Sequence, residues 1–571
     1  MAPHPDRLFP IEPEARAIAR RLHAAVAGLP IVSPHGHTDP AWYALNEPFP
    51  DPAALFVTPD HYVFRMLYSH GVQLEELGIP RLDGSAVETD PRAVWRRFAG
   101  HFHLFRGTPT RYWFEQALHD VFGIGERLGP GNADRLYDAI AEKLAGPDFR
   151  PRALYQRFNI EVIATTDGPL DDLAHHAGLR RSGWSGRVLP TYRPDAVVNP
   201  ERAGFADNVA RFVALAGEAM TFAGYLAAHR ARRAFFGSLG ATATDHGHPT
   251  ARTANLDPVE AETLFRRVLS GSPAPEDAEL FRAQMLTEMA RMSIDDKLVM
   301  QLHPGSYRNH NPLLFERFGA DMGADIPTAT NYVRDLKPLL DLFGNDKRLT
   351  LILFTLDETA YGRELAPLAG HYPALRLGPP WWFFDSPDGM RRFRELTTET
   401  AGFANTVGFN DDTRAYLSIP ARHDMARRVD CAYLARLVAD HRLEEEEART
   451  IARDLAYGLA KAADRTWASA SRRTASAGPD VSTVACGTSI GSNSPRMRAA
   501  FSGWRSALTL IGSASPSRNR RAMTSAGATQ WRMRSRPAPC STRSASAAIS
   551  ERRENGLPST MMKAGRGRFS R

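Results

Sequence analysis

The stretch IVSPHGHTDP occupies residues 31–40 and joins a short apolar run to two histidines, His35 and His37, with one glycine between them. In an extended segment alternate side chains point to the same face, so both imidazoles can bind one ion. His-x-His pairs also arise by chance, and a loop histidine hydrogen-bonded near Asp39 is the competing interpretation of His35. Residues elsewhere in the chain are needed to distinguish a metal site at a strand end from two ordinary loop histidines.

The apolar run before His35 is the first of eight within residues 1–464, each ending in polar or glycine residues and followed by a helical stretch. Strands that alternate with helices form a parallel sheet with right-handed crossovers. Eight such units predict an α/β fold, a closed (β/α)8 barrel of the TIM type. The fourth and seventh runs have the weakest strand character. The runs are residues 30–37, 160–168, 187–195, 240–247, 298–305, 348–355, 375–382 and 405–412.

The gap between the first and second runs, at about 40–155, has a helical pattern. PRAVWRRFAGHFHLF (91–105) and TRYWFEQALHDVFGI (110–124) carry apolar residues at helical spacing. Aromatic residues at that spacing are more typical of a core than of ligand contacts. We expect a helical insertion over the mouth of the barrel.

Most of the residues that carry chemistry come where a run ends. In a barrel of this type all eight strand ends meet on the C-terminal face, where active sites lie. Each residue alone could equally cap the following helix, so their joint placement is the argument for a site. They are Asp167, Arg193 with Asp195, Asp245 with His246, His303, Trp381 with Trp382, and Asp412 with Arg414.

Asp412 is the best candidate for a third metal ligand beside His35 and His37, because the eighth strand of a closed barrel returns next to the first. His303 is either a further ligand or a neighbour of the metal. Two histidines and a carboxylate leave coordination positions open, as in catalytic rather than structural sites. We expect one divalent ion, zinc first, with manganese or another ion as alternatives.

The charge of the chain is divided between two parts. Residues 465–571 carry a net charge of +16, whereas the rest carries −9. The basic part is rich in Ser and Arg and contains none of the 19 histidines, a composition that predicts disorder. One interpretation is a nucleic-acid-binding arm. The interpretation that we favour is a shifted reading frame beginning near Ala463, so no nucleic-acid partner is expected.

Three cysteines show no disulfide or zinc-knuckle spacing, which favours a reducing compartment. The N-terminal residues contain no apolar signal core, and no stretch approaches the roughly 18 apolar residues of a membrane span. We therefore expect a cytoplasmic protein without a membrane partner. Whether it forms a homo-oligomer is left open.

Several motifs together resemble the uronate isomerase (glucuronate isomerase) family of the amidohydrolase superfamily. They follow one another along nearly all of residues 1–462 and are jointly specific. The first and last segments depart from the commoner family pattern, which indicates a divergent branch. The motifs are SPHGHTDP (33–40), PDHYVFRMLYSHGV (59–72), FRGTPTRYW (105–113), TYRPDAV (191–197), TDHG (244–247), MQLHPGSYRNHN (300–311), LGPPWWFFDSPDGM (377–390) and VGFNDDTRAYLSIPARHD (407–424).

The resemblance implies an aldose–ketose isomerase that interconverts D-glucuronate with D-fructuronate, and D-galacturonate with D-tagaturonate, in hexuronate catabolism. It places the metal on His35, His37 and Asp412, and His303 near it. It also implies substrate contacts for the residues His61, Tyr62, Arg193 and Arg414.

The expected chemistry is proton transfer through a cis-enediol, which needs a base, an acid and a group that holds the developing oxyanion. The expected catalytic residues are Asp412, Tyr62 and His35. Asp412, or a hydroxide held by the metal, takes the proton, and Tyr62 donates or relays one. The other expected substrate contacts are Arg193, Arg414 and His61 at the carboxylate, Asp245 at sugar hydroxyls, His303 beside the metal, and Trp381 and Trp382 as pocket walls.

The main alternative is a mononuclear metal-dependent hydrolase or lactonase on the same scaffold. Hydrolases of this superfamily often bridge two metals with a lysine on the fourth strand, and the fourth run here, GATATDHG (240–247), has no lysine. This argues for one metal without excluding a mononuclear hydrolase.

Overall fold

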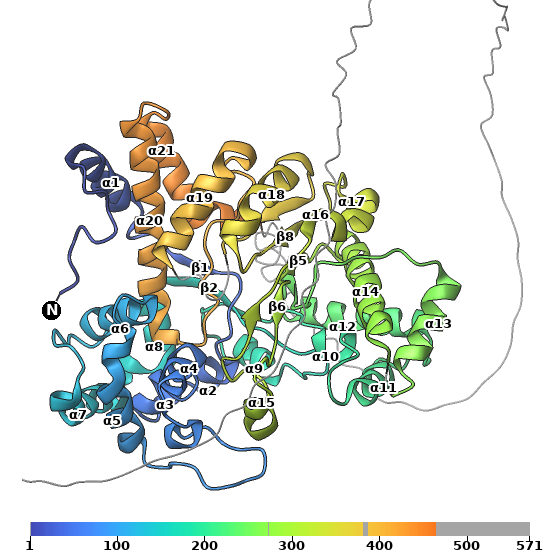
Figure 1. Cartoon of the computed structure of the whole chain (residues 1–571), viewed down its shortest axis with the longest axis horizontal. Coiled ribbons are helices and arrows are strands. Elements are labelled where there is room, and N and C mark those ends of the chain that lie inside the picture. The colour runs from blue at the N-terminus through green and yellow to red at the C-terminus, as the bar shows by residue number, and fades with distance from the viewer. Residues whose placement is uncertain (1, 272, 381–385, 464–571) are drawn as a thin grey trace, which may run out of the picture. The chain divides into compact units, whose positions relative to one another are not determined.

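A computed structural model describes residues 2–271, 273–380 and 386–463 of the chain (Figure 1). The predictions made for Trp381, Trp382 and residues 465–571 lie outside the described residues. In the described part, no helix is long and apolar enough to cross a membrane.

Seven short parallel strands form the centre of the molecule. The first three pair in the order β1-β2-β3, and the other four pair in the order β4-β5-β8-β9. Their side chains are almost all buried, as expected for a parallel sheet covered by helices. The strands are β1 (Ile31–Ser33), β2 (Ile160–Ala164), β3 (Val188–Leu189), β4 (Ala243–His246), β5 (Val299–Leu302), β8 (Leu351–Leu353) and β9 (Leu375–Leu377).

Single contacts join these strands into a ring. A parallel bridge between Tyr192 and Thr244 links the end of β3 to β4, and another between Leu377 and Thr406 links β9 to the eighth run. Just beyond the ends of that run and of β1, the His37 N–H donates to the Thr413 carbonyl over 3.1 Å. The prediction of a (β/α)8 barrel is confirmed, although the eighth run forms one bridge rather than a regular strand.

The chain between β1 and β2 is helical in the structure. These helices gather at the lower left of Figure 1, around a core that contains the fully buried Trp95, Trp113, Phe98 and Phe114. Their 3-10 turns aside, the helices are α2 (Pro40–Leu45), α3 (Pro52–Phe56), α4 (His61–Ser69), α5 (Pro91–His101), α6 (Pro109–Asp120), α7 (Ala133–Ala145) and α8 (Pro151–Arg157).

The helices that follow the later strands cover the outside of the barrel. Except for the first of them, whose Leu179 belongs to the core cluster of the insertion, their apolar faces pack against β5, β8 and β9 in one core cluster. They are α9 (Ala174–Arg181), α10 (Asp195–Val198), α11 (Phe205–Leu215), α12 (Phe222–Ser238), α13 (Pro258–Val268), α14 (Pro275–Asp296), α16 (Tyr332–Asp335), α17 (Lys337–Phe343), α18 (Glu358–His371) and α19 (Pro387–Ala401).

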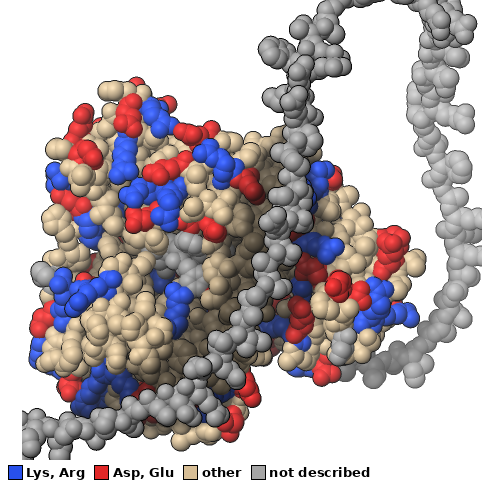
Figure 2. All heavy atoms as spheres, in the orientation of Figure 1, with Lys and Arg blue, Asp and Glu red and all other residues tan. Residues whose placement is uncertain are grey.

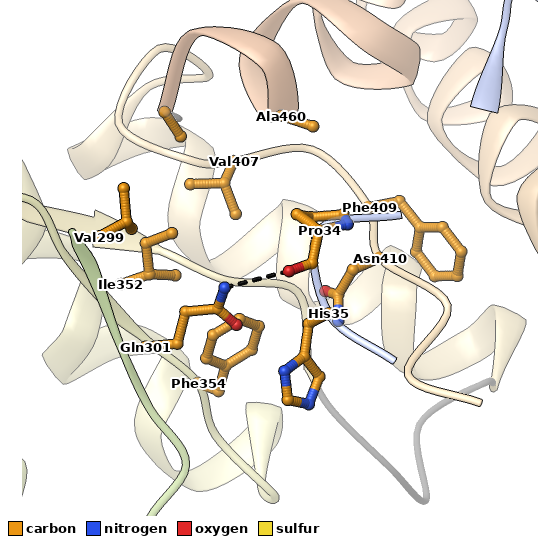
Figure 3. Close-up of a pocket in the computed structure, with 11 residues that line it drawn as sticks. Pro34, His35, Val299, Gln301, Ile352, Phe354, Val407, Phe409, Asn410 and Ala460 are labelled. Atoms are coloured by element: carbon orange, nitrogen blue, oxygen red, sulfur yellow. Dashed lines mark hydrogen bonds between the residues drawn. The ribbon is translucent and has the colours of Figure 1, made fainter. Parts of the chain in front are cut away.

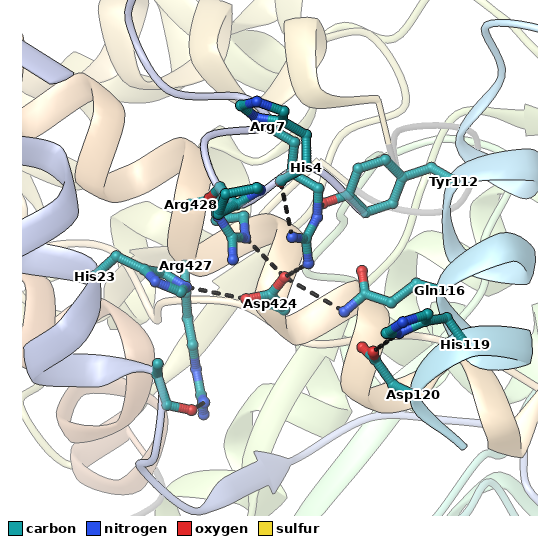
Figure 4. A network of polar contacts seen from close by, with 12 residues as sticks. His4, Arg7, His23, Tyr112, Gln116, His119, Asp120, Asp424, Arg427 and Arg428 are labelled. Carbon is teal, nitrogen blue, oxygen red and sulfur yellow. Dashed lines mark hydrogen bonds and ion pairs between the residues drawn. The ribbon is translucent and has the colours of Figure 1, made fainter. Parts of the chain in front are cut away.

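Helix α20 (Ile419–Ala439) ties the barrel to the N-terminal helix α1 (Pro13–Val26) and to the insertion. Its Asp424 accepts from Arg7 over 2.5 Å, contacts His23 of α1 at 2.9 Å and accepts from Gln116 of α6 over 3.4 Å (Figure 4). One carboxylate thus joins three segments that are far apart in sequence. The last described helices are α21 (Glu445–Arg453) and α22 (Leu459–Ala463), with a π-helical turn at Asp454–Gly458 between them.

Candidate active site

The two histidines of the opening stretch meet Asp412 at the closure of the barrel. The Nε2 atoms of His35 and His37 each lie 3.1 Å from Asp412 Oδ1. His35 is buried, whereas the His37 side chain is 25% exposed. The three side chains offer ligand atoms that all lie within 4.8 Å of one another, and one side of the cluster remains open to an incoming molecule.

The backbone explains how these side chains come together. Strand β1 ends at Ser33, because Pro34 has no N–H to continue the ladder. The histidines therefore follow the strand rather than belonging to it, which corrects the geometry expected from strand alternation. Asp412 adopts a positive φ of 41°, a conformation that residues other than glycine adopt mainly where function or packing imposes it.

Below His35 the barrel interior is apolar. The side chains of Val299, Ile352, Phe354 and Val407 line a small cavity there (Figure 3). Two amide side chains also line it, those of Asn410 and of Gln301, whose Nε2 donates to the Pro34 carbonyl over 3.2 Å. This floor keeps water away from the inner side of the cluster, so charges in the site interact strongly.

One buried atom of the triad fits a metal site. Asp412 Oδ1 lies 3.1 Å from both histidine Nε2 atoms but accepts no hydrogen bond of good geometry in the described structure, although buried polar atoms are nearly always satisfied. Burial raises the pKa of Asp412, but His35 and His37 outweigh it and hold the pKa well below its ordinary value. A carboxylate that stays ionised beside two imidazoles is the donor set that suits a divalent ion.

Asp245 of β4 and His303, which follows β5, extend the cluster. His303 stacks on His35 with ring centroids 4.5 Å apart, and its Nδ1 lies 2.8 Å from Asp245 Oδ1. Burial lowers the pKa of His303 to about 4, so its ring is neutral. With Asp245 ionised, His303 Nδ1 carries the hydrogen and Nε2 keeps a lone pair. Asp245 Oδ2 lies 3.2 Å from Arg193 Nη1.

Helix α4 supplies His61 and Tyr62. Asp60 caps this helix, its Oδ1 accepting from the Tyr62 N–H over 2.8 Å, and the rings of His61 and Tyr62 stack at 4.6 Å. Burial and Arg414 lower the pKa of His61 to about 3. Burial and Asp412 raise the pKa of Tyr62 well above its ordinary value. A neutral imidazole and a protonated phenol therefore face the triad.

Arg414 completes the site with a partner that the sequence did not indicate. Its Nη2 donates to Asp321 Oδ2 over 3.0 Å. Asp321 comes from the long connection after β5 and has no strand-end position or motif to mark it. Arg308 of the same connection was not predicted as a site residue either. It lies near Arg193, since a Cβ on Gly247 would lie 3.3 Å from Arg308 Nη2 and 2.5 Å from Arg193 Nη2.

The structure thus brings most of the predicted residues together. Asp167 is an exception, because its Oδ2 accepts from the Thr165 hydroxyl over 2.7 Å and is buried inside the wall of the barrel. His246 points to Thr244 over 2.9 Å instead of joining Asp245. A Cβ on Gly36, the glycine between the two histidines, would make only ordinary contacts.

Comparisons with known proteins agree with this architecture. The sequence profile of the family described as glucuronate isomerase matches residues 13–463. A uronate isomerase of Brucella canis is 67% identical over 461 residues, which are 81% of this chain and 99% of that protein. A uronate isomerase of Rhizobium meliloti is 66% identical over 462 residues, which are 81% of this chain and 98% of that protein.

A solved structure gives the same result. The crystal structure of glucuronate isomerase from Caulobacter crescentus superposes with a TM-score of 0.80 and 57% identity, covering 84% of this chain and 98% of that one. Sequence and fold therefore agree along nearly the whole length of these relatives, and the chain belongs to the glucuronate isomerase family of aldose–ketose isomerases.

Proposed function

We propose that this enzyme interconverts hexuronates with their 2-keto isomers, D-glucuronate with D-fructuronate and D-galacturonate with D-tagaturonate. The observation that carries the proposal is the position of the His35, His37 and Asp412 cluster beside a separate cationic group. A uronate needs both, because it has a carbonyl with a neighbouring hydroxyl at one end and a carboxylate at the other.

His35, His37 and Asp412 would hold one divalent ion, and zinc is our first choice because imidazole and carboxylate ligands with open positions suit it. When bound, such an ion polarises a carbonyl and stabilises negative charge on oxygen. His303, beside His35, would orient that ligand or contribute its Nε2 lone pair.

Asp412 and Tyr62 have the protonation states that the isomerisation requires. The hydrogen on C2 of the substrate leaves as a proton to Asp412, and the C1 carbonyl oxygen takes a proton from Tyr62, which gives a cis-enediol. The C2 hydroxyl then returns a proton to Tyr62, and the proton on Asp412 passes to C1. No atom is gained or lost, so the product has the mass of the substrate.

Arg193 and Arg414 bind the substrate carboxylate in this proposal. A guanidinium offers paired donors that match a carboxylate, and neutral His61 adds an N–H donor. The described surface carries both signs of charge interspersed on the face shown in Figure 2, so local arginines rather than a broad positive field must attract the anion. Asp245 orients Arg193 and His303, and its contact with a sugar hydroxyl stays a prediction.

The hydrolase alternative is disfavoured, because the family and its similar relatives carry isomerase names. One assay separates the two reactions. Incubation with D-glucuronate should give a ketose of unchanged mass, whereas a hydrolase would act only on an ester, lactone or amide. Exhaustive chelation should abolish turnover and one equivalent of Zn²⁺ or Mn²⁺ should restore it. Full activity without a bound divalent ion would overturn the metal proposal.

We further propose that residues 465–571 are dispensable for turnover. The relatives are matched over 98–99% of their length by about 461 residues of this chain, so the family's activity does not need the rest. A chain ending at Asp464 should keep kcat/KM within about two-fold. Salt-dependent retention of RNA or DNA by the full chain, lost on truncation, would instead favour the nucleic-acid-binding interpretation. The cytoplasmic location stays a proposal.

A further inference from the structure

The connection between β5 and β8 carries an arm that reaches over the site. The arm consists of residues 306–327, with β6 (Ser306–Tyr307) and β7 (Ile326–Pro327) paired antiparallel at its base and α15 (Pro312–Phe318) between them. Two contacts fix it internally: Asp325 accepts from the Asn309 N–H over 2.8 Å, and the His310 N–H donates to the Ala324 carbonyl over 2.7 Å.

The arm packs closely on the helix that carries His61 and Tyr62. Gly323 has a φ of +70°, and a Cβ on it would lie 2.7 Å from Arg65 Cβ and 3.0 Å from the His61 carbonyl oxygen. This approach holds the tip of the arm against α4 and places the neighbouring Asp321 at Arg414.

Two of the three carboxylates of the arm, Asp321 and Asp325, have different surroundings. The Asp325 side chain is 3% exposed and pairs with Arg308 at 3.1 Å, so it is a fixed part of the arm. The Asp321 side chain is 47% exposed, and its partner Arg414 is 37% exposed. Water therefore reaches the second pair, and an ion pair of this kind is weak enough to be exchanged.

The other cations of the site are already paired. Arg193 contacts Asp195 and Asp245, whereas Asp321 is the only carboxylate paired with Arg414 among the described residues. Burial raises the pKa of Asp321, but Arg414, Arg308 and His61 outweigh it and bring it to about 2. Asp321 is thus an ionised carboxylate close to two arginines, Arg414 and Arg308.

We propose that Asp321 occupies the anion position of Arg414 until the carboxylate of the substrate displaces it. Asp321 then competes for Arg414 with every anion that enters. An incoming carboxylate takes over the ion pair with Arg414, while the released Asp321 is hydrated. A bare inorganic anion, without the sugar to hold it, is kept out. The inference rests on the proposed contact between Arg414 and the substrate carboxylate.

Replacement of the competing charge should strengthen substrate binding without changing the chemistry. In the full-length Asp321→Asn variant, KM for D-glucuronate should fall about two- to five-fold, the range for an ion pair that water reaches, and kcat should stay within about two-fold. The inhibition constant of inorganic sulfate should fall by a similar factor. A KM that is unchanged or raised would overturn the proposal.

Two further variants separate loss of charge from loosening of the arm. Asp321→Glu keeps the carboxylate, so its KM should not fall. Asp325→Asn removes a carboxylate from the same arm without touching Arg414, so its KM should not fall either. If Asp325→Asn lowers KM as much as Asp321→Asn, mobility of the arm rather than exchange of anions is responsible, and the proposal is wrong.

Arg414→Gln distinguishes this inference from the function on which it rests. We expect it to raise KM at least ten-fold, and Asp321→Asn should have no further effect in that background. An unchanged KM in Arg414→Gln would overturn both the carboxylate contact and the inference. A raised KM in Arg414→Gln, together with no decrease in Asp321→Asn, would overturn the inference alone.

Discussion

At the scale of single residues, burial and neighbouring charges set different protonation states within the site. Asp412 stays ionised between two histidines, Tyr62 stays protonated, and His61 and His303 stay neutral. Residues of similar type elsewhere in the barrel have structural tasks instead. Asp167, for example, was a candidate by its strand-end position, yet it lies inside the barrel wall. Position at a strand end selects candidates, and the surroundings decide what each one does.

Tyr62→Phe removes the proposed proton donor while keeping the ring. Because acid catalysis by one side chain contributes about 100-fold or more, kcat for D-glucuronate should fall by that factor, with KM within about three-fold. Tyr112→Phe is the matched control, since Tyr112 accepts from Arg7 over 2.7 Å outside the site. Near-normal kcat in Tyr62→Phe, with metal content unchanged, would exclude the donor role.

Asp167 should make the folded protein less stable as the pH rises. Burial raises its pKa from 3.8 to about 7, so between these values the folded state binds more protons than the unfolded state. The free energy of unfolding should therefore fall by up to about 4 kcal/mol from pH 4 to pH 7 on this account. Urea unfolding of Asp167→Asn should show a smaller decrease than wild type, and equal decreases would contradict the assignment.

At the scale of elements, caps and crossings place the side chains. Pro34 ends β1 before the two histidines, and Asp60 starts α4 immediately before His61 and Tyr62. Both signals are visible in the sequence. These signals do not show where the side chains lie relative to one another. That depends on packing, because α4 belongs to the insertion whereas the triad lies on the barrel.

Asp60→Ala should damage activity through the helix that it caps. Loss of an N-cap costs about 1 kcal/mol, and the altered start of α4 displaces His61 and Tyr62, so kcat/KM should fall. Asp51→Ala is the control, because Asp51 caps α3 through Ala53 and Ala54, and α3 carries no proposed site residue. Both variants should lose similar stability in urea unfolding, and only Asp60→Ala should lose activity. Equal kcat/KM in the two would refute the placement role.

At the scale of the whole molecule, long-range ion pairs join the parts that carry the site. Asp424 connects the N-terminal segment, α1, α6 and α20 (Figure 4). Arg7, His23 and Arg428 outweigh the burial that raises its pKa and hold it below its ordinary value. This stabilisation is present at neutral pH and is lost as the pH falls toward the folded-state pKa.

Asp424→Asn leaves Arg7 and Arg428 without their charged partner. We expect the free energy of unfolding at pH 7 to fall by about 2–4 kcal/mol, since removing one member of a largely buried network leaves uncompensated charge. The kcat of the folded fraction should be unchanged. Asp341→Asn, which breaks the exposed pair with Lys337, should cost less than about 0.5 kcal/mol. A similar small loss in Asp424→Asn would show that the network contributes little.

The sequence by itself determined the order of strands and helices and the candidates His35, His37 and Asp412, because periodicity, strand-end position and family motifs are local or ordered along the chain. It could not show that Asp321 meets Arg414, 93 positions away, or that Asp424 joins three segments. Such contacts depend on the path of connections that carry no periodic signal. Only the tertiary structure decided them, since burial and neighbouring charge exist only once the chain has folded.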